Sequence, residues 1–413
     1  MFSVYVHVPF CVRRCGYCDF NTYTAKELGG GASQDSYADM VISELRLWAA
    51  GSASVESGAY FGMPGLTEAP FAGAGPVETV FFGGGTPTLL PPADLVRILA
   101  AIDDAFGLAV GAEVTTEANP DSVSEASISE LAAGGFNRIS LGMQSAVPAV
   151  LRNLDRTHDP AQVSRAVEWA RAAGMRVSLD LIYGTPGESL ADWRVSVEAA
   201  LATGVDHISA YALTLEPHTK MGRRVERGEL PAPDDYDEAA KYELADRLFE
   251  AAGLQCYEIS NWARGGINGP NACQHNLVYW RGQSWLGLGP GAHSHSSSQL
   301  NGTRWWNVAH PVPYSQRVAD GALPIAGFEQ LTTEQAALER VMLGLRVADG
   351  LPMEALESST RPEATAAAAS SSAKIAALIA DGLIDGQSAI AERRLVLTRK
   401  GRLLADQVTT RVT

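Results

Sequence analysis

The sequence lacks any long uninterrupted hydrophobic run, although 46% of its 413 residues are apolar. A bilayer-spanning helix needs about 20 consecutive, mostly apolar residues, so we expect no membrane span. The N-terminus also lacks a basic region followed by an apolar stretch, which predicts that there is no secretory signal peptide. Both absences favour a soluble, cytoplasmic protein.

Positive charge is scarce as well. Lysine and arginine together number 32 against 47 aspartates and glutamates, and the formal net charge is −15. Nucleic acids are polyanions that attract basic surfaces, so this balance argues against a nucleic-acid partner.

Cysteine is rare and unevenly placed. There are five cysteines, an odd number, and three of them are Cys11, Cys15 and Cys18. This pattern argues against a disulfide framework and for a reducing compartment. Thiolates spaced C-x3-C-x2-C hold zinc or an iron–sulfur cluster. Zinc would need a fourth protein ligand, and His7 is the only nearby candidate because Phe20 stands where a fourth thiolate could lie. Three ligands on a four-iron cluster would leave one iron open.

Short β-rich runs alternate with amphipathic helices over the first half of the chain. The six expected strands are 4–8, 77–82, 113–118, 138–142, 177–182 and 207–213. Strand–helix units in series predict a parallel sheet with right-handed crossovers. Polar residues gather at the C-terminal ends of these strands, where barrels of this class build their sites: Glu117, Gln144, Asp180 and Tyr211.

The string YVHVPFCVRRCGYCDF, at residues 5–20, resembles the radical S-adenosylmethionine superfamily. In that superfamily the three thiolates hold a [4Fe-4S] cluster whose open iron binds the amino and carboxylate groups of S-adenosylmethionine. The implied fold is α/β, a partial (β/α)6 TIM-like barrel. The string is also similar to a narrower group, the oxygen-independent coproporphyrinogen III oxidases and the HemW-type haem chaperones. The resemblance covers nearly the whole chain except 51–76.

The resemblance also implies which residues surround S-adenosylmethionine. The glycine-rich FFGGGTPT at 81–88 matches the motif that holds its amino group, and several further residues follow the narrower group's order. Taken singly, these residues have ordinary explanations as well: Glu117 could cap a helix, Asp180 could be a buried acid bonded to loop amides, and Arg156 could be a solvated cation. The implied contacts are Tyr5, Gly84, Gly85, Thr86, Glu117, Gln144, Arg156, Asp180 and Thr214.

HNLVYW, at 275–280, matches the HNxxYW pattern that is associated with haem binding in HemW-type proteins. His275 could offer an imidazole to iron, and Tyr279 and Trp280 could offer flat faces to a porphyrin. Residue types alone favour a different explanation, in which both aromatic rings pack in the core and His275 makes an ordinary hydrogen bond. Cys273 is a second candidate ligand.

The character of the chain changes after residue 325. Helices followed by a strand at 394–398 predict a smaller, winged-helix-like α+β domain over 326–413. The first domain is expected to span 1–325, with a flexible insertion at 51–76. Winged-helix domains often bind DNA, but the acidity of this chain favours docking of a partner or coverage of the site.

Two departures separate the functional alternatives within the resemblance. The oxidase has a further cysteine at the position of Phe20, and it has an N-terminal extension where this chain has only Met1 to Val4 before Tyr5. Together with HNLVYW, these two departures predict a haem chaperone that binds a [4Fe-4S] cluster, S-adenosylmethionine and haem. The chaperone would deliver haem to an acceptor protein, and a respiratory protein is one candidate. An electron donor for the cluster is a further expected partner. The alternatives are the oxidase, which decarboxylates two propionates by radical chemistry, and a zinc-stabilised interaction module.

Overall fold

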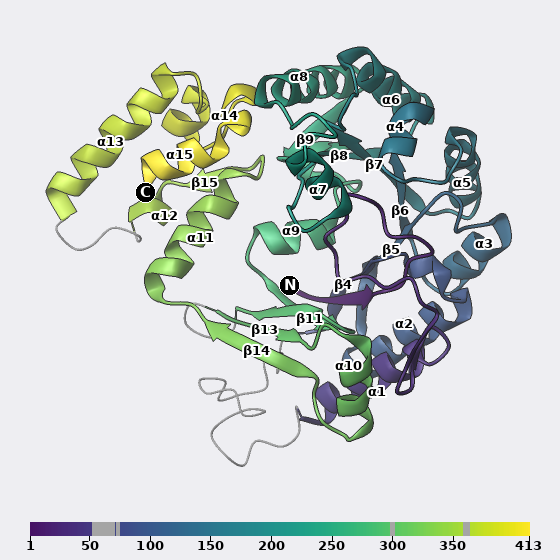
Figure 1. The fold of residues 1–413 in the computed structure, drawn as a ribbon. Coiled ribbons are helices and arrows are strands. Elements are labelled where there is room, and N and C mark those ends of the chain that lie inside the picture. The colour runs from purple at the N-terminus through teal and green to yellow at the C-terminus, as the bar shows by residue number, and fades with distance from the viewer. Residues whose placement is uncertain (52–70, 72–74, 298–301, 358–363) are drawn as a thin grey trace.

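Six strands in chain order form a continuous parallel sheet at the centre of the fold (Figure 1). Each is hydrogen-bonded to the next in parallel register, as the alternation of strand and helix predicted. The six are β1 (Phe2–Val8), β4 (Val77–Gly84), β5 (Leu108–Ala118), β6 (Arg138–Gln144), β7 (Arg176–Tyr183) and β8 (His207–Ala212).

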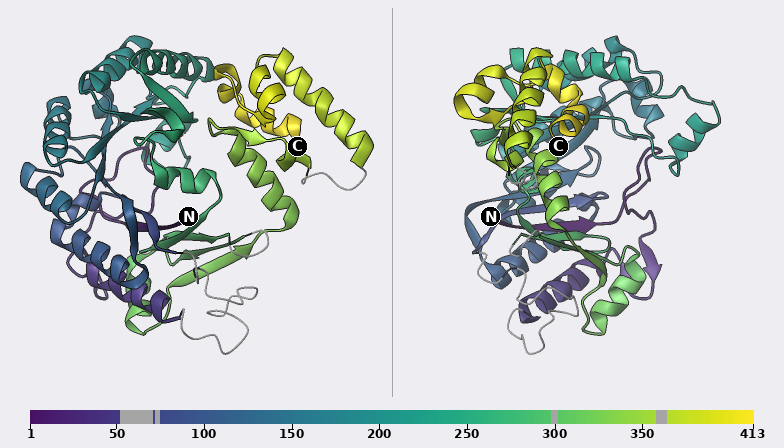
Figure 2. Two further views of the ribbon diagram at one scale, coloured as in Figure 1. Left: turned by 180° about the vertical axis from the view of Figure 1, so that it is seen from behind. Right: turned by 90° about the vertical axis from the view of Figure 1, so that its left-hand side faces the viewer.

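Further strands extend this sheet at both ends. Next to β1 the sheet continues with β11 (Ser284–Leu288), which is parallel to β1, and then with the antiparallel β12 (His293–Ser296), β13 (Thr303–Asn307) and β14 (Ile325–Gln330). Next to β8 it continues with the antiparallel β10 (Asn261–Arg264) and β9 (Leu254–Glu258). The described part of the chain thus forms a twelve-stranded sheet that curves around its inner face without closing, an α/β partial barrel as predicted (Figures 1 and 2).

The computed structural model describes residues 1–51, 71, 75–297, 302–357 and 364–413. The insertion predicted at 51–76 lies almost entirely outside these residues. Among the described residues, no helix combines the length and the hydrophobicity that crossing a membrane requires.

Helices cover the outer face of the curved sheet (Figure 2). Three of them start with a capping box, in which a side chain satisfies free backbone N–H groups: Ser124 before α3, Asp159 before α5 and Ser189 before α6. The covering helices are α1 (Tyr37–Gly51), α2 (Pro92–Phe106), α3 (Glu125–Ala133), α4 (Pro148–Asn153), α5 (Pro160–Ala172), α6 (Leu190–Ala202) and α8 (Asp235–Ala251).

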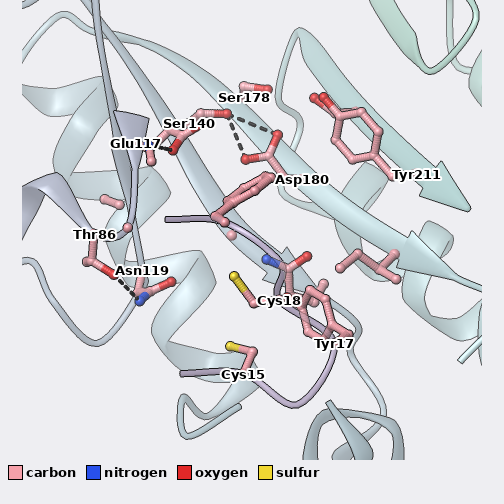
Figure 3. A pocket seen from close by; sticks show the side chains of 18 of the residues that line it. Cys15, Tyr17, Cys18, Thr86, Glu117, Asn119, Ser140, Ser178, Asp180 and Tyr211 are labelled. Atoms are coloured by element: carbon pink, nitrogen blue, oxygen red, sulfur yellow. Dashed lines mark hydrogen bonds between the residues drawn. The ribbon is translucent and has the colours of Figure 1, made fainter. Parts of the chain in front are cut away.

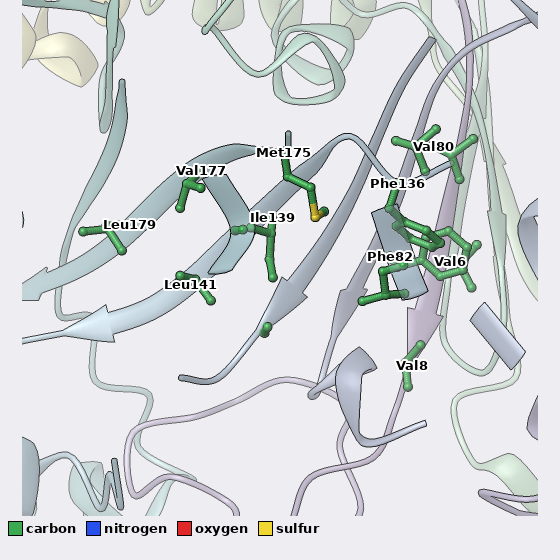
Figure 4. Packing of buried hydrophobic residues seen from close by; sticks show 14 of the residues in the cluster. Val6, Val8, Val80, Phe82, Phe136, Ile139, Leu141, Met175, Val177 and Leu179 are labelled. Atoms are coloured by element: carbon green, nitrogen blue, oxygen red, sulfur yellow. The ribbon is translucent and has the colours of Figure 1, made fainter. Parts of the chain in front are cut away.

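Successive residues of a strand point to opposite faces, and this alternation separates the core from the site. On β6, Ile139 and Leu141 are fully buried in the outer core, and Leu179 of β7 joins them (Figure 4). The residues between them, Ser140 and Asp180, face inward and line a cavity. The same strands therefore carry both the hydrophobic core and the polar site.

The C-terminal part is mostly helical and has its own core, which includes Leu345, Leu378 and Leu395. The strand expected at 394–398 is shorter, because only β16 (Arg394–Leu395) pairs, with β15 (Leu351–Pro352), while Leu397 forms a single bridge to Ile384. Its helices are α11 (Thr333–Leu345), α12 (Glu354–Glu357), α13 (Ala364–Ala380), α14 (Arg399–Leu403) and α15 (Ala405–Val412).

The junction between the two parts is built from both sides of the predicted boundary at residue 325. β14 belongs to the large sheet, since it pairs with β13 as far as Gln330. Asp246 of α8 binds both Arg399 and Arg402 of α14 and accepts a hydrogen bond from Trp262 Nε1 at 2.7 Å. The division into two domains remains a prediction, and these contacts define how the two parts meet.

Candidate functional site

The inner face of the sheet encloses a cavity of about 630 Å³. Its size is within the range of small-molecule and cofactor sites. All thirteen residues that the sequence singled out as site residues line it: Tyr5, Cys11, Cys15, Cys18, Gly84, Gly85, Thr86, Glu117, Gln144, Arg156, Asp180, Thr214 and His275. The fold therefore brings to one cavity residues that are up to 270 positions apart in the chain.

The three clustered cysteines lie on the loop that follows β1, and all three thiols are free (Figure 3). The loop is held by backbone hydrogen bonds from Cys11 N to Tyr23 O at 3.0 Å and from Cys18 N to Cys15 O at 3.2 Å. Burial raises the pKa of Cys11 to about 11, although the Thr86 hydroxyl, 3.8 Å from its sulfur, opposes the shift. A thiolate here needs a positive partner, and bound iron would be one.

The grouping of these thiols bears on what they could hold. Among the described residues, no three His, Cys, Asp or Glu side chains converge so that they could hold a single metal ion. Phe20, at the position that could have held a fourth thiolate, is 59% exposed at the rim of the cavity. The three thiols line one cavity, and no fourth protein ligand is grouped with them among the described residues, a donor set that fits a cluster with one open iron better than a four-coordinate zinc ion.

Gly84 and Gly85 are glycines for reasons of packing. Gly84 has a φ of +109°, and a Cβ there would lie 2.5 Å from the His7 ring. A Cβ on Gly85 would lie 2.5 Å from Phe10 O. Valine at Gly84 would obstruct a ligand there and would also collide with the His7 ring on β1, so this substitution cannot report on ligand binding alone.

Arg156 is the centre of a network beside the cysteine loop. Its guanidinium donates to Asn119 Oδ1, to Gly142 O at 3.0 Å and to Cys15 Sγ at 3.7 Å. Asn119 in turn donates to Thr86 Oγ1 at 3.1 Å (Figure 3). The cation is therefore fixed in the wall of the cavity, which excludes the alternative of a solvated helix-end cation.

Two half-buried carboxyl groups face the cavity from β5 and β7. Glu117 accepts a hydrogen bond from Gly84 N at 3.1 Å, and Asp180 accepts from Ser140 Oγ at 2.8 Å (Figure 3). Burial raises the pKa of Glu117 to about 8, and the nearby charge of Asp180 adds to the effect. Burial raises the pKa of Asp180 too, against hydrogen bonds from Ser209 and Ser140. Such groups are suited to accept hydrogen bonds from hydroxyls or an ammonium group.

The remaining S-adenosylmethionine candidates differ in how firmly they are held. The Tyr5 hydroxyl lies 3.1 Å from His7 Nδ1, and His7 Nε2 lies 3.0 Å from Asn21 O, so the Tyr5 ring is fixed in the wall. Gln144 has a φ of +62°, which is unusual for a residue with a side chain and marks the abrupt end of β6. Thr214 lines the cavity just beyond β8.

His275 lies at the start of α9 (Gln274–Trp280) and is only 1% exposed. Both ring nitrogens are engaged, Nδ1 with Thr79 Oγ1 at 2.7 Å and Nε2 with Tyr279 OH at 2.9 Å. Burial lowers its pKa to about 3, and the charge of Arg138 contributes, so the imidazole is neutral. In this structure, His275 therefore makes ordinary hydrogen bonds, which is the alternative that the residue types alone favoured.

The two aromatic residues of HNLVYW do not face the same space. Tyr279 lines the cavity of the predicted site, whereas Trp280 lines a second cavity, of about 410 Å³, beside α11. Adjacent residues of a helix point about 100° apart, which prevents both rings from flanking one ligand. Cys273 lines the first cavity, but its thiol is buried beside Glu113 Oε1 at 3.6 Å, and burial raises its pKa to about 12.

Several residues of the cavity were not singled out from the sequence. Asn119 follows the end of β5, and the others lie at every second position of β6, β7 and β8, so the signal for these was a polar residue at every second position. That pattern was masked because the intervening residues are strongly apolar. These residues are Asn119, Arg138, Ser140, Ser178, His207 and Ser209.

Comparisons with known proteins agree with this geometry. The model of the radical SAM superfamily matches residues 60–200, and the model of the HemN C-terminal domain matches residues 331–404. The solved structure of the Escherichia coli radical SAM enzyme HemN, a coproporphyrinogen III oxidase, matches with a TM-score of 0.78 over 100% of this chain and 89% of that chain. At 23% identity this likeness shows a shared fold.

Two curated relatives are similar in sequence over most of their length. Heme chaperone HemW of Mycobacterium tuberculosis (strain H37Rv) is 47% identical over 408 residues, which are 98% of this chain and 93% of that protein. Heme chaperone HemW of Bacillus subtilis is 33% identical over 353 residues, 85% of each protein. The chain therefore belongs to the HemW family, within the radical S-adenosylmethionine superfamily.

Proposed function

We propose that this protein is a haem chaperone that binds a [4Fe-4S] cluster, S-adenosylmethionine and haem, and that it delivers haem to an acceptor protein. The observation that carries the proposal is that three free thiols and fixed polar groups line one cavity, in a chain that is 47% identical to a protein named heme chaperone HemW. When bound, the cluster supplies an open iron and an electron.

Cys11, Cys15 and Cys18 hold the cluster in this proposal, and the chain's other residues place S-adenosylmethionine beside it. Arg156 binds the carboxylate of S-adenosylmethionine, because its guanidinium already lies next to Cys15 and can form a charge-assisted pair. The amino group lies against Gly84, Gly85 and Thr86. The remaining contacts are Glu117 and Asp180 to the ribose hydroxyls or the amino group, Gln144 to the ribose or carboxylate, Tyr5 beside the methionyl part, and Thr214.

His275 is the proposed contact of the haem iron. Its neutral imidazole is a good iron ligand, and it lines the same cavity. Ligation through Nε2 requires that the 2.9 Å hydrogen bond to Tyr279 be given up, so haem binding includes a local rearrangement of α9. Cys273 is the less suitable ligand because its thiol is buried and protonated.

The partners belong to the same proposal. We place the protein in the cytoplasm, with an electron donor for the cluster and a haem acceptor that includes respiratory-chain proteins among the candidates. The net charge of −15 does not suit a nucleic-acid partner.

A paired assay tests the proposal on anaerobically purified, cluster-reconstituted protein. One sample is titrated with hemin and followed by its Soret absorption, and the other is incubated with coproporphyrinogen III, S-adenosylmethionine and a reductant. We expect a saturable Soret shift and no protoporphyrinogen IX. If protoporphyrinogen forms at a catalytic rate, the protein is the oxidase and not a chaperone. If the parent protein does not bind hemin, the proposed chaperone function is wrong.

The ligand of the iron is tested with variants of the same protein. His275→Ala should alter the Soret position, and Cys273→Ala should not. Circular dichroism on both variants is needed because His275→Ala leaves the hydroxyls of Thr79 and Tyr279 without their partner. If both variants give the same spectrum as the parent, neither residue is the ligand of the haem iron, and the chaperone function is not affected by that result.

A further inference from the structure

Arg138 is a buried cation whose guanidinium forms no ion pair with any of the described residues. It opens β6, is 2% exposed and lines the inner part of the 630 Å³ cavity. Its Nη2 is enclosed and has no hydrogen-bond partner, and none of the ion pairs among the described residues includes this side chain. A guanidinium carries five N–H donors and a permanent charge. Burial opposes that charge, whereas the nearby Cys273 thiol and Glu113 carboxylate favour it and raise the pKa of Arg138, yet no described side chain accepts a hydrogen bond from Nη2.

Glu113 is a carboxylate whose charge reaches Arg138, but its contacts are to other residues, and its Oε2 has no hydrogen-bond partner. Glu113 Oε1 accepts hydrogen bonds from His275 N at 3.1 Å and from Cys273 Sγ at 3.6 Å. Its Oε2 lies 3.3 Å from Nη1 of Arg176, on the neighbouring strand β7. Arg138 and Arg176 lie opposite each other on the neighbouring strands β6 and β7. Among the described residues, Arg176 forms an ion pair with Glu113, and Arg138 forms none.

The polar side chains around Arg138 are satisfied by one another. His207 lies 2.6 Å from Ser178 Oγ through Nδ1 and 2.9 Å from Tyr257 OH through Nε2. Burial and the charge of Arg138 lower the pKa of His207 and of His275, so both imidazoles are neutral. The cavity wall around Arg138 thus carries a fixed positive charge, and none of the described carboxylates forms an ion pair with it.

This charge is distinct from the cation proposed for S-adenosylmethionine. Arg156 donates to Gly142 O, four residues further along β6 than Arg138. At about 3.3 Å per residue, the two backbone positions are roughly 13 Å apart. A single carboxylate cannot bind bidentately at both places, so the cavity has two separate positions for an anion.

We propose that Arg138 binds a carboxylate of a second ligand, and that this carboxylate is a propionate of haem. The inference rests on the proposed haem binding and adds a polar anchor at the inner end of the cavity, next to His275. A haem offers a planar apolar body with carboxylates at one edge. A cavity with a neutral imidazole and one buried guanidinium on its inner wall complements that arrangement.

The first measurement uses the protein without added haem. Arg138→Gln and Arg138→Met remove a charge that has no partner, so their melting temperatures should equal or exceed that of the parent. Arg171→Gln is the control: Arg171 of α5 is exposed, donates to Thr203 O at 2.8 Å and does not line the cavity. It should melt at a lower temperature than the parent and bind hemin normally.

The second measurement compares hemin with hemin dimethyl ester, whose propionates carry no charge. Parent protein should bind hemin about 10- to 100-fold more tightly than the ester, which is the range expected for a charge-assisted pair. Arg138→Gln should bind both equally, at the parent's affinity for the ester. S-adenosylmethionine should bind parent and variant alike.

The outcomes separate this inference from the proposed function. If the parent binds hemin and Arg138→Gln binds it equally well, Arg138 does not bind a propionate, and the proposed chaperone function is unaffected. Loss of S-adenosylmethionine affinity alone would assign the carboxylate to that ligand and overturn the haem anchor. A lower melting temperature in both Arg138 variants would make the residue structural. If the parent does not bind hemin, the proposed function and the anchor fail together.

Discussion

Replacing Arg156 with alanine should weaken the binding of S-adenosylmethionine by about 1.5–3 kcal/mol, the range for hydrogen bonds to charged groups. That range corresponds to an increase in Kd of about 10- to 150-fold. The structure favours a substantial effect because Asn119, Gly142 O and Cys15 hold the guanidinium in place before any ligand arrives. Little side-chain entropy is then lost on binding.

The same substitution has a second effect, on stability. It leaves Asn119 Oδ1 and Gly142 O without their donor, and each unsatisfied group costs about 1–3 kcal/mol when water cannot replace the donor. Both groups face the cavity, where water is available, so the loss should fall at the lower end of that range. Arg156→Lys keeps the charge but not the planar fork, and should be intermediate in affinity.

Anaerobic calorimetric titration with S-adenosylmethionine measures the affinity, and iron analysis of the same sample confirms that the cluster is intact. Arg152→Ala, an exposed arginine on α4 four residues away, is the matched control and should leave Kd unchanged. An unchanged Kd in Arg156→Ala with full iron content would refute the placement of the carboxylate at this residue.

Three further predictions concern the cluster and the fold. Cys11→Ala should lose the iron and the broad visible absorption of reconstituted protein, while Cys256→Ala keeps both; four irons in the former would exclude the cluster assignment. Burial raises the pKa of Glu44 from 4.5 to about 7, so the folded state binds its proton more tightly and stability falls as pH rises from 4.5 to 7. Glu44→Gln should reduce the slope of the unfolding free energy against pH by up to about 1.4 kcal/mol per pH unit, as measured by urea denaturation at pH 5, 6 and 7. The same slope in parent and variant would contradict this. Asp246→Asn should lower the free energy of unfolding by about 3 kcal/mol, because Asp246 is buried and pairs with two arginines of α14. Glu250→Gln is the control: Glu250 is 71% exposed, and the change should be less than about 1 kcal/mol. Equal losses in the two variants would show that burial of the pair does not matter.

The order of the central strands could be predicted from the sequence because each strand is a short apolar run followed by an amphipathic helix. Right-handed crossovers then leave one arrangement for β1 and β4 to β8, and their C-terminal ends must share an edge. Glu117, Gln144 and Asp180 each stand at or near such an end, so the sequence could place them together.

Elements that lie beyond this repeating unit were less predictable. β14 continues the large sheet past residue 325, where composition alone suggested a boundary, because its pairing with β13 is decided by neighbours in space. The wing expected at 394–398 is reduced to a two-residue pair for the same reason: β15 offers only two residues to pair with it.

The sequence by itself determined which residue types reach the cavity, since the period of two along each strand sends alternate side chains inward. Only the tertiary structure decided how they are partnered. It turned Trp280 toward a different cavity from Tyr279, gave His275 two hydrogen bonds, and paired Glu113 with Arg176 so that Arg138 remained unpaired. A charge is paired or unpaired according to groups that lie far apart in the chain, and these distances exist only once the sheet has formed.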